Sequence, residues 1–222
     1  MGLRTANLSE QIAAHLAARI VRWELAPGEH LPELELARQL DVSTNSLREA
    51  FRVLERQHLI EIQPRRGARV CEVTETDVTN LYDFLFLLLS ELAARAARHW
   101  QGDQMADLAA LLPEFERHHA SNDIAAAHEV AFGFVTLAVQ RFAGNRYLAE
   151  DIEDLLPLLR RYSYLALQEE TSELDVSLDI FRRLLLNVLN RNAQAAAADI
   201  REYGSKQCQI VLRAIAKRAA AA

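Results

Sequence analysis

The chain has 222 residues, half of them hydrophobic, and a net charge of −6. This length and composition exclude a disordered chain and favour two folded domains. Its two cysteines, Cys71 and Cys208, match neither a secreted disulfide framework nor a zinc site, so we expect a cytoplasmic location. The longest wholly apolar run, Phe84 to Leu89, is too short to cross a bilayer, and the first residues lack a signal core. We therefore expect no export and no membrane partner.

Charge is distributed unevenly along the chain. Residues 1–73 hold 10 arginines and 10 acidic residues, whereas residues 74–222 hold 15 basic and 21 acidic residues. Within the first part, six arginines but only three glutamates lie between positions 43 and 70. This pattern predicts a locally basic surface on an acidic protein, and such a surface attracts phosphate groups within a screening length of about 10 Å.

The first 73 residues predict three helices followed by a β-hairpin. Apolar residues recur at helical spacing from Leu8 to Ile20, a short second helix is expected at 32–40, and a third begins near Thr44. Only residues 41–43 separate the last two, as in a helix-turn-helix motif. A strand is then expected before a turn at 64–67, with a return strand at 69–73.

A row of small polar residues stands at the start of the third helix. Ser43 is expected to cap the helix, and the next three residues to project from its first turn, where free N–H groups and the helix dipole favour phosphate. In a helix-turn-helix protein this turn enters the major groove. The row could also be a capping signal only, but two arginines at the hairpin tip favour DNA, since such a wing can reach the backbone or the minor groove. The predicted DNA-binding residues are Ser43, Thr44, Asn45, Ser46, Arg48, Arg52, Arg65, Arg66 and Gly67.

The order of residues over 8–73 resembles the winged-helix domain of GntR-type bacterial transcription regulators. The matching positions are Pro27-Gly28, Leu31, Leu36-Ala37, Val42-Ser43, Arg48-Glu49-Ala50, Leu54, Leu59 and Gly67. Thr44 and Leu34 depart from the family, in which arginine is common at both positions. The resemblance implies double-stranded operator DNA as a partner. Asn45 can pair with adenine through two hydrogen bonds, so it is the leading candidate for reading a base.

From Thr74 onward the pattern is helical only. Helices are expected at 74–100, 103–119, 122–142, 146–169, 173–191 and 193–218, separated by short polar breaks. The predicted fold is mainly α, with a winged helix-turn-helix domain at 1–73 and an antiparallel all-helical bundle at 74–222. The apolar stretch Leu81–Leu92 is expected in the bundle core, with a dimer interface as the alternative.

A helical bundle that follows such a DNA-binding domain resembles the FadR-like branch of the family, whose effector-binding domain is called FCD. The resemblance rests on "AGNRYL" and "FRRLLLNVLNRNAQAAAADIREY". Many members hold a metal through one aspartate and three histidines. Those positions fall here at Phe132, Thr136, Phe181 and Tyr203, so we expect neither a metal nor another cofactor. His128, Phe132 and Thr136 share one helical stripe, which we expect to face a cavity.

Two adjacent arginines, Arg160 and Arg161, could bind the carboxylate of a ligand. More often such a pair forms a solvated face or an ion pair with a neighbour such as Glu153. The predicted effector-binding residues are His128, Phe132, Thr136, Arg160, Phe181 and Tyr203.

The sequence contains none of the common catalytic motifs, so we expect no enzyme activity. The main hypothesis is a homodimeric transcription repressor controlled by a small-molecule effector, an organic acid or another partly apolar metabolite. Homodimerisation is expected because two linked reading units multiply a weak single-site affinity. In the alternative hypothesis the helical domain serves only for oligomerisation or interaction and binds no ligand.

Overall fold

The computed structural model describes residues 8–64, 66–169 and 172–221. The chain divides into two compact units. The first contains the residues up to Thr74 together with Asp154–Tyr162, and the second contains Glu75–Glu153 and the residues from Ser163 onward. The domain boundary at 73/74 and the assignment of all later residues to one domain stay a prediction.

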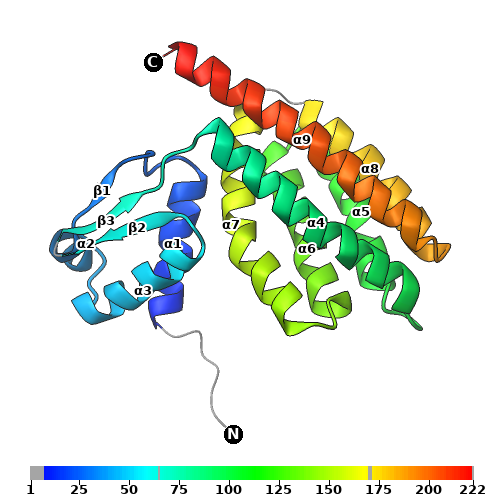
Figure 1. The fold of residues 1–222 in the computed structure, drawn as a ribbon, viewed down its shortest axis with the longest axis horizontal. Coiled ribbons are helices and arrows are strands. Elements are labelled where there is room, and N and C mark those ends of the chain that lie inside the picture. Colours follow the sequence, from blue (N-terminus) through cyan, green and yellow to red (C-terminus); the bar gives the residue numbers. More distant parts are fainter. Residues whose placement is uncertain (1–7, 65, 170–171, 222) are drawn as a thin grey trace, which may run out of the picture. The chain divides into compact units, whose positions relative to one another are not determined.

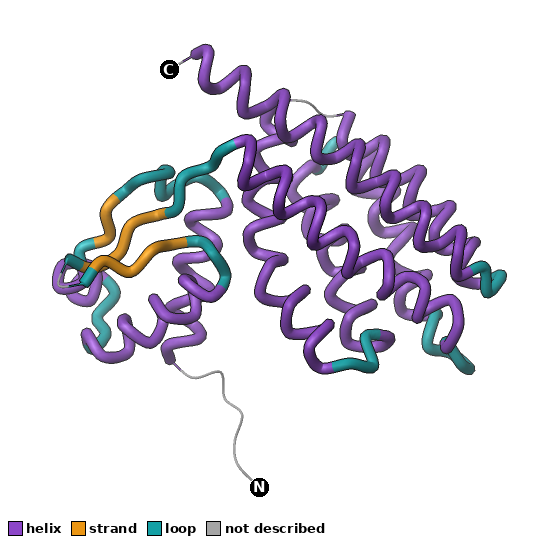
Figure 2. Tube along the Cα trace, in the orientation of Figure 1, coloured by secondary structure: helices purple, strands orange, loops and turns teal. Residues whose placement is uncertain are grey.

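Over its described residues up to Thr74, the first unit combines three helices with a small antiparallel sheet (Figures 1 and 2). Residues at helical spacing, Leu16 and Ile20 on α1 and Leu47 and Leu54 on α3, are fully buried where these two helices pack together. The sheet has the strand order β1-β3-β2. The elements are α1 (Leu8–Val21), β1 (His30–Leu31), α2 (Glu33–Gln39), α3 (Thr44–Arg56), β2 (Ile60–Gln63) and β3 (Gly67–Val70).

The hairpin differs in two ways from the sequence prediction. The return strand β3 ends at Val70 instead of Val73, because its partner β2 begins at Ile60, which is paired with Val70. It starts at Gly67, whose φ of 94° and close approach to the carbonyl oxygen of Leu31 require a residue without a side chain. The two-residue strand β1 was not predicted, because two residues cannot show an alternating pattern.

The second unit is all-helical over its described residues, as the sequence predicts. Helices α4 and α9 lie side by side with the most extensive contact in the chain (Figure 1). On α4, Leu81, Leu85 and Leu89 are buried, whereas Phe84 and Leu87 are 49% and 62% exposed. The elements are α4 (Glu75–His99), α5 (Ala106–Ala120), α6 (Ile124–Phe142), α7 (Arg146–Glu169), α8 (Ser172–Leu189) and α9 (Ala193–Ala221).

The predicted fold class, mainly α with a winged helix-turn-helix unit and a helical domain, is confirmed. Among the described residues, no helix is both long and apolar enough to span a membrane.

Candidate DNA-binding and effector sites

The first turn of α3 is held by the cap that the sequence predicts. Ser43 has an extended backbone, and its hydroxyl oxygen accepts a hydrogen bond from the backbone N–H of Ser46 at 3.0 Å. The two hydroxyl oxygens are 2.8 Å apart. Thr44 is half-buried and Asn45 is exposed. Ser43 and Ser46 therefore bond each other, and the reading of a base by exposed Asn45 stays a prediction.

Arginines along α3 are exposed but paired with carboxylates. Arg48 lies 2.8 Å from Glu33 of α2, and Arg52 bonds Glu49 one turn earlier. The side chains of Arg48 and Arg52 are 60% and 66% exposed. The Arg52–Glu49 pair is solvated on both sides and is weak in water, so Arg52 can exchange its carboxylate for a DNA phosphate at small cost. The side chain of Glu33 is only 19% exposed, so the same exchange costs Arg48 more. Glu33 was not among the predicted site residues, since nothing in the sequence shows that it faces α3.

The wing tip is only partly described, since Arg65 lies outside the described residues. Arg66 is exposed, and its backbone N–H donates to the carbonyl oxygen of Gln63 at 3.0 Å. Its own carbonyl oxygen bonds the Nε2 atom of His30, which ties the tip to β1. Gly67, the next residue, is the first of β3. Its role in DNA contact stays a prediction.

On α6, His128 contacts α7. His128 is buried, and its Nε2 atom lies 3.1 Å from the hydroxyl oxygen of Ser163. Its ring packs on Phe132, with centroids 4.7 Å apart, and edge-on to Tyr164 at 6.2 Å. The hydroxyl of Thr136 donates to the backbone carbonyl of Phe132 at 3.0 Å. The polar groups of His128 and Thr136 are thus bonded to protein, and their place beside a cavity stays a prediction.

Phe181 and Tyr203 lie together in a second group, built mainly from aromatic rings. Their centroids are 5.8 Å apart, and Phe181 also contacts Phe115 at 5.7 Å and Phe134 at 5.2 Å. The hydroxyl of Tyr203 lies 2.8 Å from that of Ser177, which is 2% exposed. Sequence reasoning missed Ser177 and Phe134, because helical spacing does not show which turns of separate helices meet.

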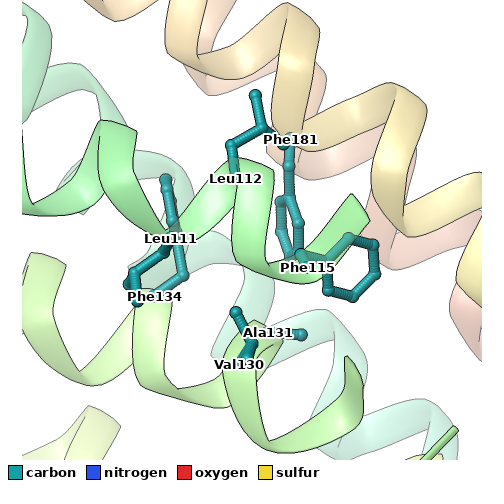
Figure 3. Close-up of a pocket in the computed structure, with 7 residues that line it drawn as sticks. All are labelled: Leu111, Leu112, Phe115, Val130, Ala131, Phe134 and Phe181. Carbon is teal, nitrogen blue, oxygen red and sulfur yellow. The ribbon is translucent and has the colours of Figure 1, made fainter. Parts of the chain in front are cut away.

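A small apolar pocket adjoins Phe181 (Figure 3). Its volume is about 10 Å³, close to that of one water-sized sphere and far below the hundreds of Å³ of an ordinary ligand site. Of the predicted effector-binding residues it includes Phe181, so the α6 stripe does not line it. A metabolite could enter only if these side chains moved. The lining residues are Leu111, Leu112, Phe115, Val130, Ala131, Phe134 and Phe181.

The four positions that resemble the family's metal site do not fit a metal. Phe132 and Phe181 have no lone pair to offer, and the hydroxyls of Thr136 and Tyr203 have protein partners. Over the part of the chain that the structure describes, no group of three histidine, cysteine, aspartate or glutamate residues could hold an ion.

The two adjacent arginines of α7 have different surroundings. Arg160 is half-buried and belongs to the α7 segment that is grouped with the first unit. Arg161 is fully buried, which contradicts the alternative of a solvated face for this residue.

Comparison with known proteins decides the family. Residues 8–70 match the family model of the bacterial regulatory proteins of the gntR family, and residues 80–204 match the FCD domain. The chain belongs to the GntR family, in its branch with an FCD domain. Its expected resemblance to GntR regulators is therefore confirmed.

Relatives of this GntR protein are named as transcription regulators, not enzymes. It is 24% identical over 204 residues to the HTH-type transcriptional repressor GlaR of Escherichia coli, covering 89% of this chain and 92% of that protein. It is 25% identical over 187 residues to the gluconate operon transcriptional repressor of Bacillus licheniformis, covering 83% and 74%. Its fold is similar to that of E. coli McbR/YncC, with a TM-score of 0.80, 20% identity and coverage of 94% and 99%.

Proposed function

We propose that this GntR regulator represses transcription by binding an operator through the first turn of α3 and the wing. Exposed Asn45 would read a base, while Arg48, Arg52 and Arg66 would contact phosphates. The names of two relatives that match most of the chain, both repressors, support the sign of regulation. We further propose that the protein acts in the cytoplasm as a homodimer, because paired reading units suit paired half-sites.

Control by an effector is the second part of the proposal. It is carried by one observation, the hydroxyl pair of Tyr203 and Ser177 among the rings around Phe181. Such a group suits a ligand with an apolar body, which the rings would cover, and a polar or acidic end, which would bond one of the two hydroxyls in place of its present protein partner. The printed name of the B. licheniformis relative concerns a gluconate operon, which makes organic acids the first class to screen.

Replacement of Tyr203 by Phe tests this assignment. In the unchanged chain, a matching acid from a screen should raise Tm at saturating concentration, since it binds only the folded state. Tyr203→Phe should lose most of that rise while its operator affinity without ligand stays unchanged. Tyr147→Phe is a matched control, because Tyr147 is 64% exposed. If Tyr203→Phe loses operator affinity in the absence of ligand, Tyr203 is a packing residue and the effector site lies elsewhere.

The small pocket favours a second candidate function. The space beside Phe181, about 10 Å³, accommodates no metabolite, which is compatible with a helical domain that serves only for oligomerisation or interaction. This alternative expects no Tm shift with any member of the screen, while operator binding persists.

For an effector to regulate, it must bind one state of the protein more tightly than the other. The segment 72–76, which precedes and begins α4, is a proposed route for this coupling.

A further inference from the structure

Arg161 on α7 is the most unusual buried side chain of the first unit. It is 0% exposed, and its Nε, NH1 and NH2 atoms have no hydrogen-bond partner among the described residues. Removal of a guanidinium from water without replacing its hydrogen bonds is among the costliest steps in folding. Burial lowers the pKa of Arg161, and nearby Tyr162, Cys71 and Glu72 act in the opposite direction. A charged group held in this way requires an explanation.

Trp23 is the residue that holds Arg161 in place. The guanidinium carbon lies 5.3 Å from the centroid of the Trp23 ring, a cation–π contact. The indole N–H of Trp23 donates to the backbone carbonyl of Arg161 at 3.3 Å. Trp23 follows the last turn of α1 with a φ of 60°, a conformation that a bulky residue adopts only under constraint. Two unfavourable features, a strained backbone and an unpaired buried cation, therefore meet in one contact.

Helix α7 connects this contact to the predicted effector residues. Arg161 belongs to the first unit, whereas Ser163, two residues later, belongs to the second and bonds His128. Residues two apart on a helix point about 200° apart, so one turn of α7 carries both contacts on opposite faces. His128 in turn packs on Phe132 of the α6 stripe. A shift of α7 that changes the bond to His128 must also move Arg161 against Trp23.

We propose that Arg161 is a positioning residue that, through its contact with Trp23, transmits the state of the FCD domain to the DNA-reading unit. The inference rests on the proposed effector control and names its route. Because no hydrogen bond among the described residues holds the guanidinium, release of Arg161 restores its solvation, at the cost of the contact with Trp23 and of the packing around a fully buried side chain. The nearby carboxylate of Glu72, in the proposed coupling segment, offers the released cation a partner. A small change in α7 can thus alter the contact without breaking a hydrogen bond of the guanidinium.

The test uses the full chain and a DNA duplex selected in vitro for binding to it, so no effector is needed. Coupling is reciprocal, so DNA bound to the first unit should change hydrogen exchange in the α6 peptide around His128. In Arg161→Met the chain should still bind the duplex, but the change in exchange should fall at least several-fold. Arg146→Met, on the exposed start of the same helix, should respond like the unchanged chain.

Two further readouts separate coupling from packing. Arg161→Met removes an unpaired buried charge, so its Tm should equal or exceed that of the unchanged chain. Trp23→Phe keeps an aromatic ring but loses the indole donor, and it should weaken the exchange response even if Arg161→Met folds poorly. If both variants show an exchange response as large as that of the unchanged chain, the role of Arg161 is overturned, but the proposed effector control is not. If the unchanged chain binds DNA without any response, the proposed effector control fails as well.

Discussion

Asn45 and Arg48 lie one turn apart on α3 and are expected to contribute differently to DNA binding. Asn45 is exposed at the first turn, where an amide can bond a base edge. The side chain of Arg48 is 60% exposed although it is paired with Glu33, and its charge can bind a phosphate. Asn45→Ala should therefore flatten the preference at one base position by about 1–3 kcal/mol. Arg48→Ala should weaken binding nearly equally on all sequences and reduce the salt slope by about one.

Binding titrations over a set of single-base operator variants, at several salt concentrations, distinguish these effects. Uniform weakening by Asn45→Ala would demote Asn45 to a positioning role. An unchanged salt slope in Arg48→Ala would mean that its guanidinium stays with Glu33 in the complex.

Asp199 and Glu202 on α9 bind the same guanidinium but differ in burial. Arg183 donates to both, and Asn187 also donates to Asp199 at 2.6 Å. The side chain of Asp199 is 9% exposed and that of Glu202 is 43% exposed. Asp199→Ala removes a buried carboxylate and takes an acceptor from half-buried Asn187 and from Arg183, so it should lower the free energy of unfolding by about 1–3 kcal/mol. Glu202→Gln should change it by no more than about 0.5 kcal/mol, because its ion pairs are solvated.

Urea denaturation at neutral and acid pH measures both effects. A hydrogen bond from Lys206, together with the charge of Arg183, lowers the pKa of Glu202. Its folded carboxylate therefore stabilises the protein at neutral pH, and this contribution disappears as the pH falls through the lowered pKa. The small difference between Glu202→Gln and the unchanged chain should vanish in acid. Equal losses in the two variants at neutral pH would show that burial does not decide the strength of these bonds.

At the scale of the elements, the helices were predictable because polar breaks and apolar periodicity act locally. Helix α7 spans 146–169, the range that the polar breaks and apolar periodicity predict. Helix α6 begins directly after its capping residue, Asp123. The short strand β1 and the end of β3 were not predictable, since pairing between distant segments sets them. The same limit applies to the site. Spacing places His128 and Phe132 on one stripe, but only tertiary packing brings Ser163 to His128.

Two helical glycines should respond to alanine with opposite signs. At Gly133 in α6 an added Cβ meets nothing within 4 Å, so alanine should stabilise the chain by about 0.5–1 kcal/mol through helix propensity. At Gly204 in α9 the same atom would lie 2.4 Å from the ring of Phe86. That ring is buried and stacked on Tyr82 at 5.2 Å, so it has little freedom to move.

Gly204→Ala should therefore destabilise by about 1–3 kcal/mol despite the better helix propensity. Thermal unfolding of the two variants in parallel checks the prediction. A stabilised Gly204→Ala would mean that α9 can move away from α4 at little cost, and that their close approach does not depend on glycine.

For the whole molecule, the charge balance limits how tightly one reading unit can hold DNA. The chain carries a net charge of −6, and the exposed arginines Arg48 and Arg52 begin in ion pairs that DNA must displace. One reading unit is then expected to form only a few phosphate contacts. Each of them adds a modest amount to the free energy of DNA binding at physiological salt. Tight binding is then expected to require two linked units, the proposed homodimer, on successive faces of the duplex.

A selected operator should therefore contain two half-sites whose centres lie about 10 base pairs, or a multiple of this, apart. Two chains should bind each duplex, as counted by native mass spectrometry. Scrambling one half-site should reduce the affinity for DNA by at least about 10²-fold. The second unit then has no specific site to bind at the high effective concentration that its linkage to the first unit provides. Scrambling an equal number of bases outside both half-sites is the control and should change little. One chain per duplex, with equal affinity for a single half-site, would show that the protein reads DNA as a monomer.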